Sequence, residues 1–155
     1  MRLVLFQPEI AQNAGAATRA AACFDAGLDI IEPCGFPIGA KSYARVAMDY
    51  GHITPPSVHA SWTAFENSAV RQAGRLVLLT TKADMDLWDW PFAETDLIML
   101  GQESAGVPDH VHAACDARVR IPISANTRSL NMAMAGAIAL AAARRALMVP
   151  PPGAA

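Results

Sequence analysis

The sequence is short of charge, of cysteine and of long apolar runs, and each shortage excludes a class of protein. Only 17% of its 155 residues are charged and 53% are hydrophobic, which suits a compact globular domain with part of its surface covered by a partner. The cysteines (Cys23, Cys34 and Cys115) are odd in number, widely spaced and without a C-x-x-C, so neither a disulfide framework nor a zinc site is indicated. We expect free, buried thiols in a reducing cytoplasm and no bound metal.

No apolar stretch predicts a targeting or membrane segment. The run at 3–7 is too short for a signal peptide, and the Ala-rich C-terminal segment lacks the unbroken span of roughly 20 residues that a membrane helix needs. The formal net charge is −2, so any nucleic-acid binding must rest on a local basic patch.

Strand-like and helix-like segments alternate along the chain, which predicts an α/β fold. The pattern indicates a single domain over residues 1–149, with a mostly parallel sheet and helices on both faces, followed by a Pro-rich flexible tail at 150–155. Strands are expected at 2–6, 29–32, 75–80, 96–100 and 118–121, and helices at 13–26, 40–50, 61–73, 108–114 and 129–147.

Ligands of open parallel sheets bind beyond the carboxyl ends of the strands, so the turns there are the places to inspect. The first turn leads into Asn13–Arg19, where Asn13 can cap a helix and Arg19 lies about one and two-thirds turns further on. An ordinary capped helix with a surface arginine also explains this pattern.

The other two turns follow the fourth and fifth expected strands. Residues 101–108 (G-Q-E-S-A-G-V-P) form a glycine turn without the Gly-Lys-Ser/Thr of a P-loop, and a tight βα turn is an equally good interpretation. Residues 121–131 crowd Asn126, Thr127, Arg128, Ser129 and Asn131 into six positions. A helix cap needs only one such residue, and the surplus favours a binding role.

Taken together, these segments resemble the SPOUT superfamily of methyltransferases, and within it the TrmL (YibK-type) tRNA 2′-O-methyltransferases. The resemblance covers about residues 1–147 and rests on an ordered set of motifs. They are L-F-Q-P-E-I-A-Q-N-A-G-A-A-T-R at 5–19, I-I-E-P-C-G-F at 30–36, M-D-Y at 48–50, L-T-T-K at 79–82, L-G-Q-E-S-A-G-V-P at 100–108 and R-I-P-I-S-A-N-T-R-S-L-N-M-A at 120–133.

The resemblance implies a deep trefoil knot near the C-terminus, a homodimer and S-adenosylmethionine as cofactor. Periodicity alone could not have predicted the knot, because true knots are close to absent from proteins. Two residues depart from the family pattern: Ala105 stands where relatives often have arginine, and Ala141 where some have a tyrosine at the dimer interface. The first position belongs to an RNA contact of the family, and the second to the contacts between its two protomers.

The resemblance also assigns site residues. It places the cofactor against Leu79, Gly101, Ile121 and Ser129, with Leu79 and Ile121 as apolar walls for adenine. It matches Arg19, Asn13, Glu103, Ser129 and Asn131 to polar active-site positions, with Glu103 orienting Arg19, and it matches Lys41, Arg45 and Arg128 to RNA contacts.

The implied reaction is 2′-O-ribose methylation of the wobble pyrimidine, position 34, in the tRNA anticodon loop. A guanidinium is almost always protonated, so we expect Arg19 to stabilise the developing alkoxide while a phosphate oxygen or water takes the proton. Three alternatives stay open: a 2′-O-methyltransferase acting on rRNA or on another tRNA position, a non-catalytic knotted RNA-binding factor, and a metabolite-binding α/β protein.

Overall fold

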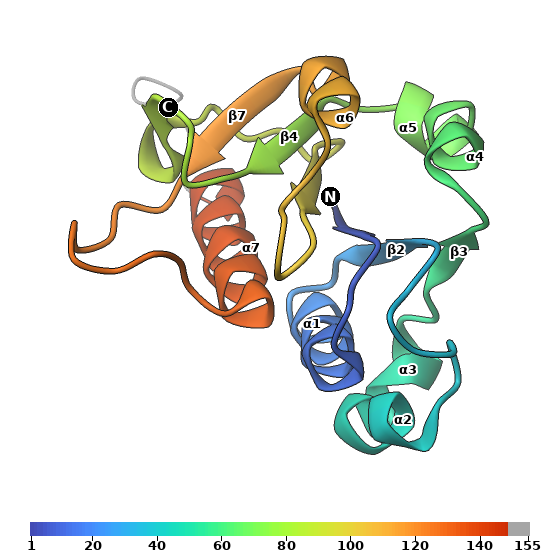
Figure 1. The fold of residues 1–155 in the computed structure, drawn as a ribbon. Helices are drawn as coiled ribbons and strands as arrows, with labels where there is room; N and C mark the ends of the chain where they lie inside the picture. The colour runs from blue at the N-terminus through green and yellow to red at the C-terminus, as the bar shows by residue number, and fades with distance from the viewer. Residues whose placement is uncertain (149–155) are drawn as a thin grey trace.

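Seven parallel strands form the centre of the computed structural model, which describes residues 1–148 (Figure 1). The order across the sheet is β3-β2-β1-β6-β4-β7-β5. The strands are β1 Arg2–Phe6, β2 Gly27–Ile31, β3 Ser57–His59, β4 Leu76–Leu79, β5 Met85–Asp86, β6 Leu97–Leu100 and β7 Ala117–Arg120. The predicted tail at 150–155 lies outside the described residues.

The central strands consist almost entirely of buried apolar residues. β1 (R-L-V-L-F), β6 (L-I-M-L) and β4 (L-V-L-L) lie side by side, and apart from Arg2 and Leu79 all their side chains are at most 3% exposed. Strands covered on both faces have this near-continuous apolar pattern. The predicted α/β sheet with helices on both faces is therefore confirmed.

Helices cover the two faces with different kinds of residue. On one face, α1 and α7 contact each other through alanines such as Ala14, Ala17 and Ala139, whose small side chains allow close approach. On the other face, Phe65 of α4 and Val111 of α6 contribute to a second apolar cluster. The helices are α1 Ala11–Cys23, α2 Lys41–Ala47, α3 Tyr50–Ile53, α4 Trp62–Glu66, α5 Ala69–Gln72, the 3₁₀ helix η1 Leu87–Asp89, α6 Asp109–Ala114 and α7 Met132–Met148.

Several local predictions were wrong. The short strands β3 and β5 were missed, and the expected helix at 61–73 is two helices, α4 and α5, each capped by its own serine, Ser61 and Ser68. Asn13 does not cap α1, which begins two residues earlier behind Ile10. Helix α7 begins at Met132 rather than at Ser129.

Two further expectations have different outcomes. Of the three thiols predicted to be buried, only Cys115 is; Cys34 is half-buried and Cys23 is exposed. The knot stays a prediction, because strand order and pairing do not record how the chain threads through itself. Within residues 1–148, no helix is long and apolar enough to cross a membrane.

Candidate active site

A cavity of about 890 Å³ opens at the carboxyl ends of β4, β6 and β7. Loops that follow these three strands form its walls, and the starts of α1 and α7 complete it. The four residues that the resemblance assigned to the cofactor, Leu79, Gly101, Ile121 and Ser129, all line this cavity. Of the polar site residues, Asn13, Glu103 and Asn131 line it as well.

Glycine at position 101 is what allows the loop after β6 to fold back on itself. A Cβ atom at Gly101 would lie 2.6 Å from the carbonyl carbon of Gly106, closer than real Cβ atoms come to backbone. Gln102 and Gly106 exchange two backbone hydrogen bonds of 2.8 and 3.0 Å, and Gly106 has a φ of +70°, which favours glycine. This tight turn shapes one wall of the cavity.

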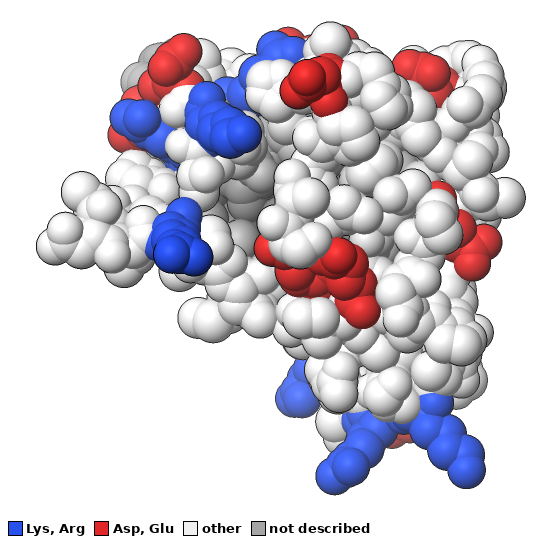
Figure 2. All heavy atoms as spheres, viewed as in Figure 1, with Lys and Arg blue, Asp and Glu red and all other residues white. Residues whose placement is uncertain are grey.

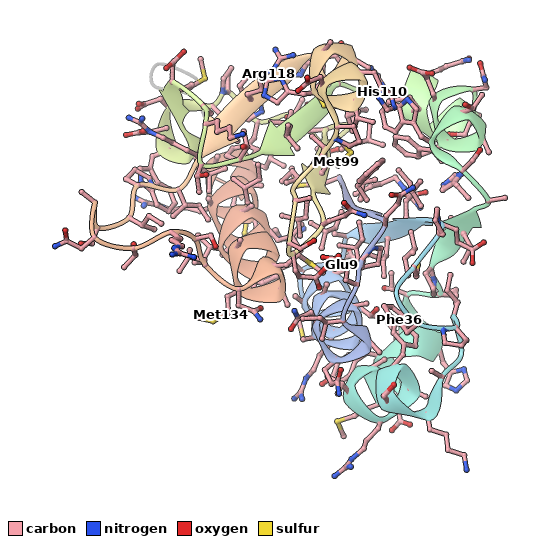
Figure 3. All side chains as sticks on the ribbon, in the orientation of Figure 1. Glu9, Phe36, Met99, His110, Arg118 and Met134 are labelled. Atoms are coloured by element: carbon pink, nitrogen blue, oxygen red, sulfur yellow. The ribbon has the colours of Figure 1, made fainter. Side chains whose placement is uncertain are left out.

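A carboxylate clamps the loop after β1 to the loop after β6. The Glu9 side chain accepts hydrogen bonds from the backbone N–H and the hydroxyl of Ser104, at 2.8 and 2.7 Å. These bonds stabilise the charged form, so the pKa of Glu9 is lowered, with the Ser104 hydroxyl as the largest cause. Figure 3 shows Glu9 where these two loops meet.

A chain of hydrogen bonds then links Glu103 to helix α7. Glu103 accepts from the backbone N–H of Glu9 (2.8 Å) and from the side-chain amide of Asn13 (3.2 Å). Asn131 donates to the Asn13 side-chain oxygen at 2.9 Å, and its own oxygen accepts two backbone N–H groups at the start of α7, at 2.9 and 3.2 Å. Asn131 is therefore the cap of α7, and these polar residues hold three segments in fixed relative positions.

Arg19 does not line the cavity of its own chain. Its side chain is exposed on the part of α1 that faces α2 and α3, where the guanidinium carbon is 5.2 Å from the centre of the Tyr50 ring. One guanidinium nitrogen is 3.8 Å from the Met48 sulfur. Within this chain Glu103 is bonded to Asn13 and to backbone. The expectation that it orients Arg19 stays a prediction.

The three residues expected to contact RNA fall into two places. Lys41 and Arg45 are exposed on α2, one helical turn apart, and Figure 2 shows basic side chains at this tip of the molecule. Arg128 is exposed on the loop between β7 and α7, beside the cavity. Figure 2 also shows acidic side chains in the middle of the same face, over the loops that Glu9 clamps.

Sequence reasoning assigned no role to several cavity residues. Lys82, Asp109 and His112 line the cavity too. The ring nitrogen Nδ1 of His112 accepts a hydrogen bond of 3.2 Å from the Arg118 side chain, which also donates to the His112 carbonyl. Their position in the sequence could have identified Asp109 and His112, because α6 starts just after the glycine turn and its residues therefore border the cavity.

Burial changes the chemistry of one thiol beside this region. Cys34 has its pKa raised to about 11, first because burial disfavours the thiolate and then because of the nearby charges of Glu32 and Glu103. It is therefore a thiol at neutral pH and a poor nucleophile.

Comparison with known proteins gives matches along nearly the whole chain. A model of the "SpoU rRNA Methylase family" matches residues 1–141. Two relatives are each named tRNA (cytidine(34)-2′-O)-methyltransferase. The one from Ancylobacter novellus is 47% identical over 145 residues, which is 94% of this chain and 92% of the relative. The one from Beijerinckia indica is 46% identical over 143 residues, or 92% and 89% of the two chains.

Solved structures share the fold. A structure described as "Structural insights into the 2-OH methylation of C/U34 on tRNA" matches with a TM-score of 0.88 at 35% identity, covering 94% of this chain and 95% of that chain. The SpoU methyltransferase AviRb from Streptomyces viridochromogenes, in complex with the cofactor AdoMet, has a TM-score of 0.85. It is 24% identical and is matched over 94% of this chain and 59% of its own, a likeness of fold.

Proposed function

This chain belongs to the SpoU rRNA methylase family, and on that premise we propose that it methylates the ribose 2′-hydroxyl of the wobble pyrimidine, position 34, of tRNA. The observation that carries the proposal is the cavity whose walls come from the loops after β4, β6 and β7. Relatives that share 47% and 46% of the residues over almost the whole chain have names that state this activity.

The cavity fits S-adenosylmethionine. About 890 Å³ is within the usual range for a small-molecule site, and the lining combines apolar walls with polar backbone. Leu79 and Ile121 would hold the adenine, and the turn at Gly101, which a Cβ atom would obstruct, would offer backbone groups to the ligand. When bound, this cofactor supplies a methyl group on a positively charged sulfur, ready for transfer.

Arg19 acts on the other reactant, the sugar oxygen. Its guanidinium stays protonated, so it stabilises negative charge on the 2′-oxygen and on a neighbouring phosphate rather than removing a proton. Asn13, Glu103, Ser129 and Asn131 complete the polar side of the cavity, the first two and Asn131 by holding its loops together. A phosphate oxygen or a water molecule takes the proton.

Two copies are needed for this arrangement, because Arg19 stands outside the cavity of its own chain. The exposed face of α7 supports a homodimer: Met134, Ala141 and Met148 are spaced seven residues apart, share one side of the helix and are all exposed. Met134 is 58% exposed and Met148 is 71% exposed. In the dimer that we propose, this apolar face is buried against a second copy and Arg19 of one protomer serves the cavity of the other.

The RNA contacts extend from the basic tip to the cavity. Lys41 and Arg45 on α2 and Arg128 beside the cavity bind phosphates, which compensates locally for the net charge of −2. An anticodon loop presents splayed, single-stranded nucleotides, the form of RNA that proteins most often recognise. The enzyme works in the cytoplasm on transfer RNA.

The test is methyl transfer from labelled S-adenosylmethionine to total tRNA, followed by mapping of the product. We expect label at the 2′-oxygen of nucleotide 34. Label only in ribosomal RNA, or at another tRNA position, would support 2′-O-methylation as the reaction but would show that nucleotide 34 of tRNA is not the substrate. No heat on titration with S-adenosylhomocysteine, together with no transfer, would instead indicate a non-catalytic RNA-binding protein.

A further inference from the structure

The motif M-D-Y at 48–50 has no part in the cavity, yet it surrounds the residue that the reaction depends on. Arg19 lies over the ring of Tyr50, with 5.2 Å between the guanidinium carbon and the ring centre, and within 3.8 Å of the Met48 sulfur. Tyr50 is half-buried at the start of α3, whereas Arg19 and Met48 are exposed. The exposed Arg19 side chain therefore contacts both Met48 and Tyr50.

The backbone between α2 and α3 is bent in an unfavourable way to produce this arrangement. Met48 has φ 49° and ψ −140°, and the next residue, Asp49, has φ −74° and ψ −10°. These angles correspond to a type II′ turn, whose first central position normally holds glycine. A methionine there is strained, and such strain collects at functional sites.

The turn is anchored on both sides. The backbone N–H of Met48 donates to the carbonyl of Ala44 at the end of α2, and that of His52 donates to the carbonyl of Asp49 in α3, at 2.9 and 3.1 Å. Gly15 of α1 allows α2 to approach, because a Cβ there would lie 2.8 Å from the Tyr43 carbonyl oxygen. The distance between α1 and the turn is therefore fixed by backbone contacts.

We propose that Tyr50 is a positioning residue for Arg19, and that the Met48–Tyr50 turn exists to present its ring beneath the guanidinium. The inference rests on the proposed function, in which Arg19 acts on the ribose oxygen of the substrate. A guanidinium held over an aromatic face keeps its N–H groups directed outward and loses few rotamers when it meets that oxygen. Tyr50 itself touches neither the RNA nor the cofactor.

The test separates the aromatic face from the apolar volume of the side chain. Tyr50→Phe keeps the ring, whereas Tyr50→Leu keeps an apolar side chain without a π face. We expect Tyr50→Phe to keep kcat near that of the unmodified protein, and Tyr50→Leu to lose about 2- to 5-fold in kcat, the range expected for an exposed cation–π contact. KM for tRNA and the affinity for S-adenosylhomocysteine should change less than 2-fold in both, roughly within measurement error.

Ile53→Ala is the matched control, since Ile53 lies on the same short helix with its side chain 67% exposed. It should leave kcat and the melting temperature near those of the unmodified protein. If Tyr50→Leu keeps the turnover of Tyr50→Phe, the inference is overturned. Arg19→Lys, measured alongside, shows which idea failed: an active Arg19→Lys enzyme contradicts the role of Arg19 itself, whereas an inactive one confines the failure to Tyr50.

Discussion

The cofactor cavity and the α1–α2–α3 tip of this molecule differ in structure, because the first is an enclosed site and the second is an exposed surface. The cavity is lined by residues of one chain, and its glycine turn, the Glu9 bonds and the Asn131 cap hold the loops after β1 and β6 and the start of α7 together. At the tip, Arg19, Lys41 and Arg45 are exposed, and Figure 2 shows basic side chains projecting from this end of the molecule. The cavity can enclose a small ligand, whereas the tip presents exposed positive charges that can contact another molecule, such as the RNA substrate.

This difference explains how a small domain can act on a large RNA. Affinity for a cofactor requires enclosure, which one hydrophobic core can provide. In the mechanism proposed above, transfer to a sugar oxygen also needs a cation beside the acceptor, and Arg19 of a second protomer would supply it. We therefore expect substitutions in the cavity to reduce cofactor affinity, and substitutions at the tip to reduce turnover or binding of tRNA without changing cofactor affinity.

The largest expected effect comes from Arg19→Lys. We expect turnover to fall about 100- to 1,000-fold, as when one donor to a developing oxyanion is lost, because lysine cannot offer the planar fork of a guanidinium. The affinity for S-adenosylhomocysteine, measured by calorimetry, should hardly change, because the cavity is formed without Arg19. Turnover within a few-fold of the unmodified enzyme would contradict the role of Arg19.

Mixing two differently impaired variants, at a cofactor concentration too low to fill a Gly101→Ala cavity, tests whether Arg19 serves the neighbouring cavity. A protomer with Arg19→Lys and one with a damaged cavity, Gly101→Ala, would form a heterodimer with one working site. Random exchange should restore about a quarter of normal activity if the arginine acts between protomers. If the mixture stays inactive although co-purification of differently tagged protomers shows mixed dimers, Arg19 acts within its own chain.

The second effect in size belongs to the cavity alone. Gly101→Ala places a Cβ atom 2.6 Å from backbone, so the turn must open and the wall must shift. We expect affinity for S-adenosylhomocysteine to fall at least about 10-fold and stability to fall by about 1–3 kcal/mol, typical of overpacking. The matched control is Gly51→Ala, since an added Cβ there meets nothing within 4 Å. Equal cofactor affinity in both variants would show that the turn does not shape the site.

The sequence predicted the cavity region better than the tip, and the reason is physical. Buried strands such as β1 and β6 carry continuous apolar runs, and the ends of parallel strands meet at one edge, so the turns at 101–108 and 121–131 could be expected together. The individual cofactor residues 79, 101, 121 and 129 came from the family resemblance, and all four line the cavity. By contrast, the type II′ turn at Met48 contains no glycine from which it could have been predicted. The ring beneath Arg19 belongs to Tyr50, which is 31 positions away in the sequence. Tertiary contacts of that kind leave no periodic signal.

Local details also escaped prediction where side chains had two possible partners. Asn13 has the character of a helix cap, but its side chain bridges Glu103 and Asn131 instead, and the helix starts without a side-chain cap. The strands β3 and β5 have three and two residues, too few for an alternating pattern to be recognised.

A smaller effect is expected at the tip. Lys41→Ala with Arg45→Ala should raise KM for tRNA about 3- to 10-fold near physiological salt, with kcat unchanged, because exposed cations contribute through phosphate contacts. The dependence of KM on salt should flatten by roughly one counterion for each charge removed. An unchanged salt dependence would mean that RNA approaches from a different side, for example along the loop that carries Arg128.

The smallest effect concerns the clamp between Glu9 and Ser104. The pKa of Glu9 is lowered in the folded protein, so its bonds stabilise the fold above the ordinary value of 4.5 and lose this contribution as pH falls through the lowered pKa. Ser104→Ala should therefore lower the melting temperature slightly at about pH 7, and the difference from the unmodified protein should shrink as the pH is lowered below 4.5 and through the lowered pKa of Glu9. A difference that is constant with pH would mean that the clamp does not depend on the charge of Glu9. Cofactor affinity should follow the same trend, since the clamp joins two loops at the edge of the cavity and has no counterpart at the tip.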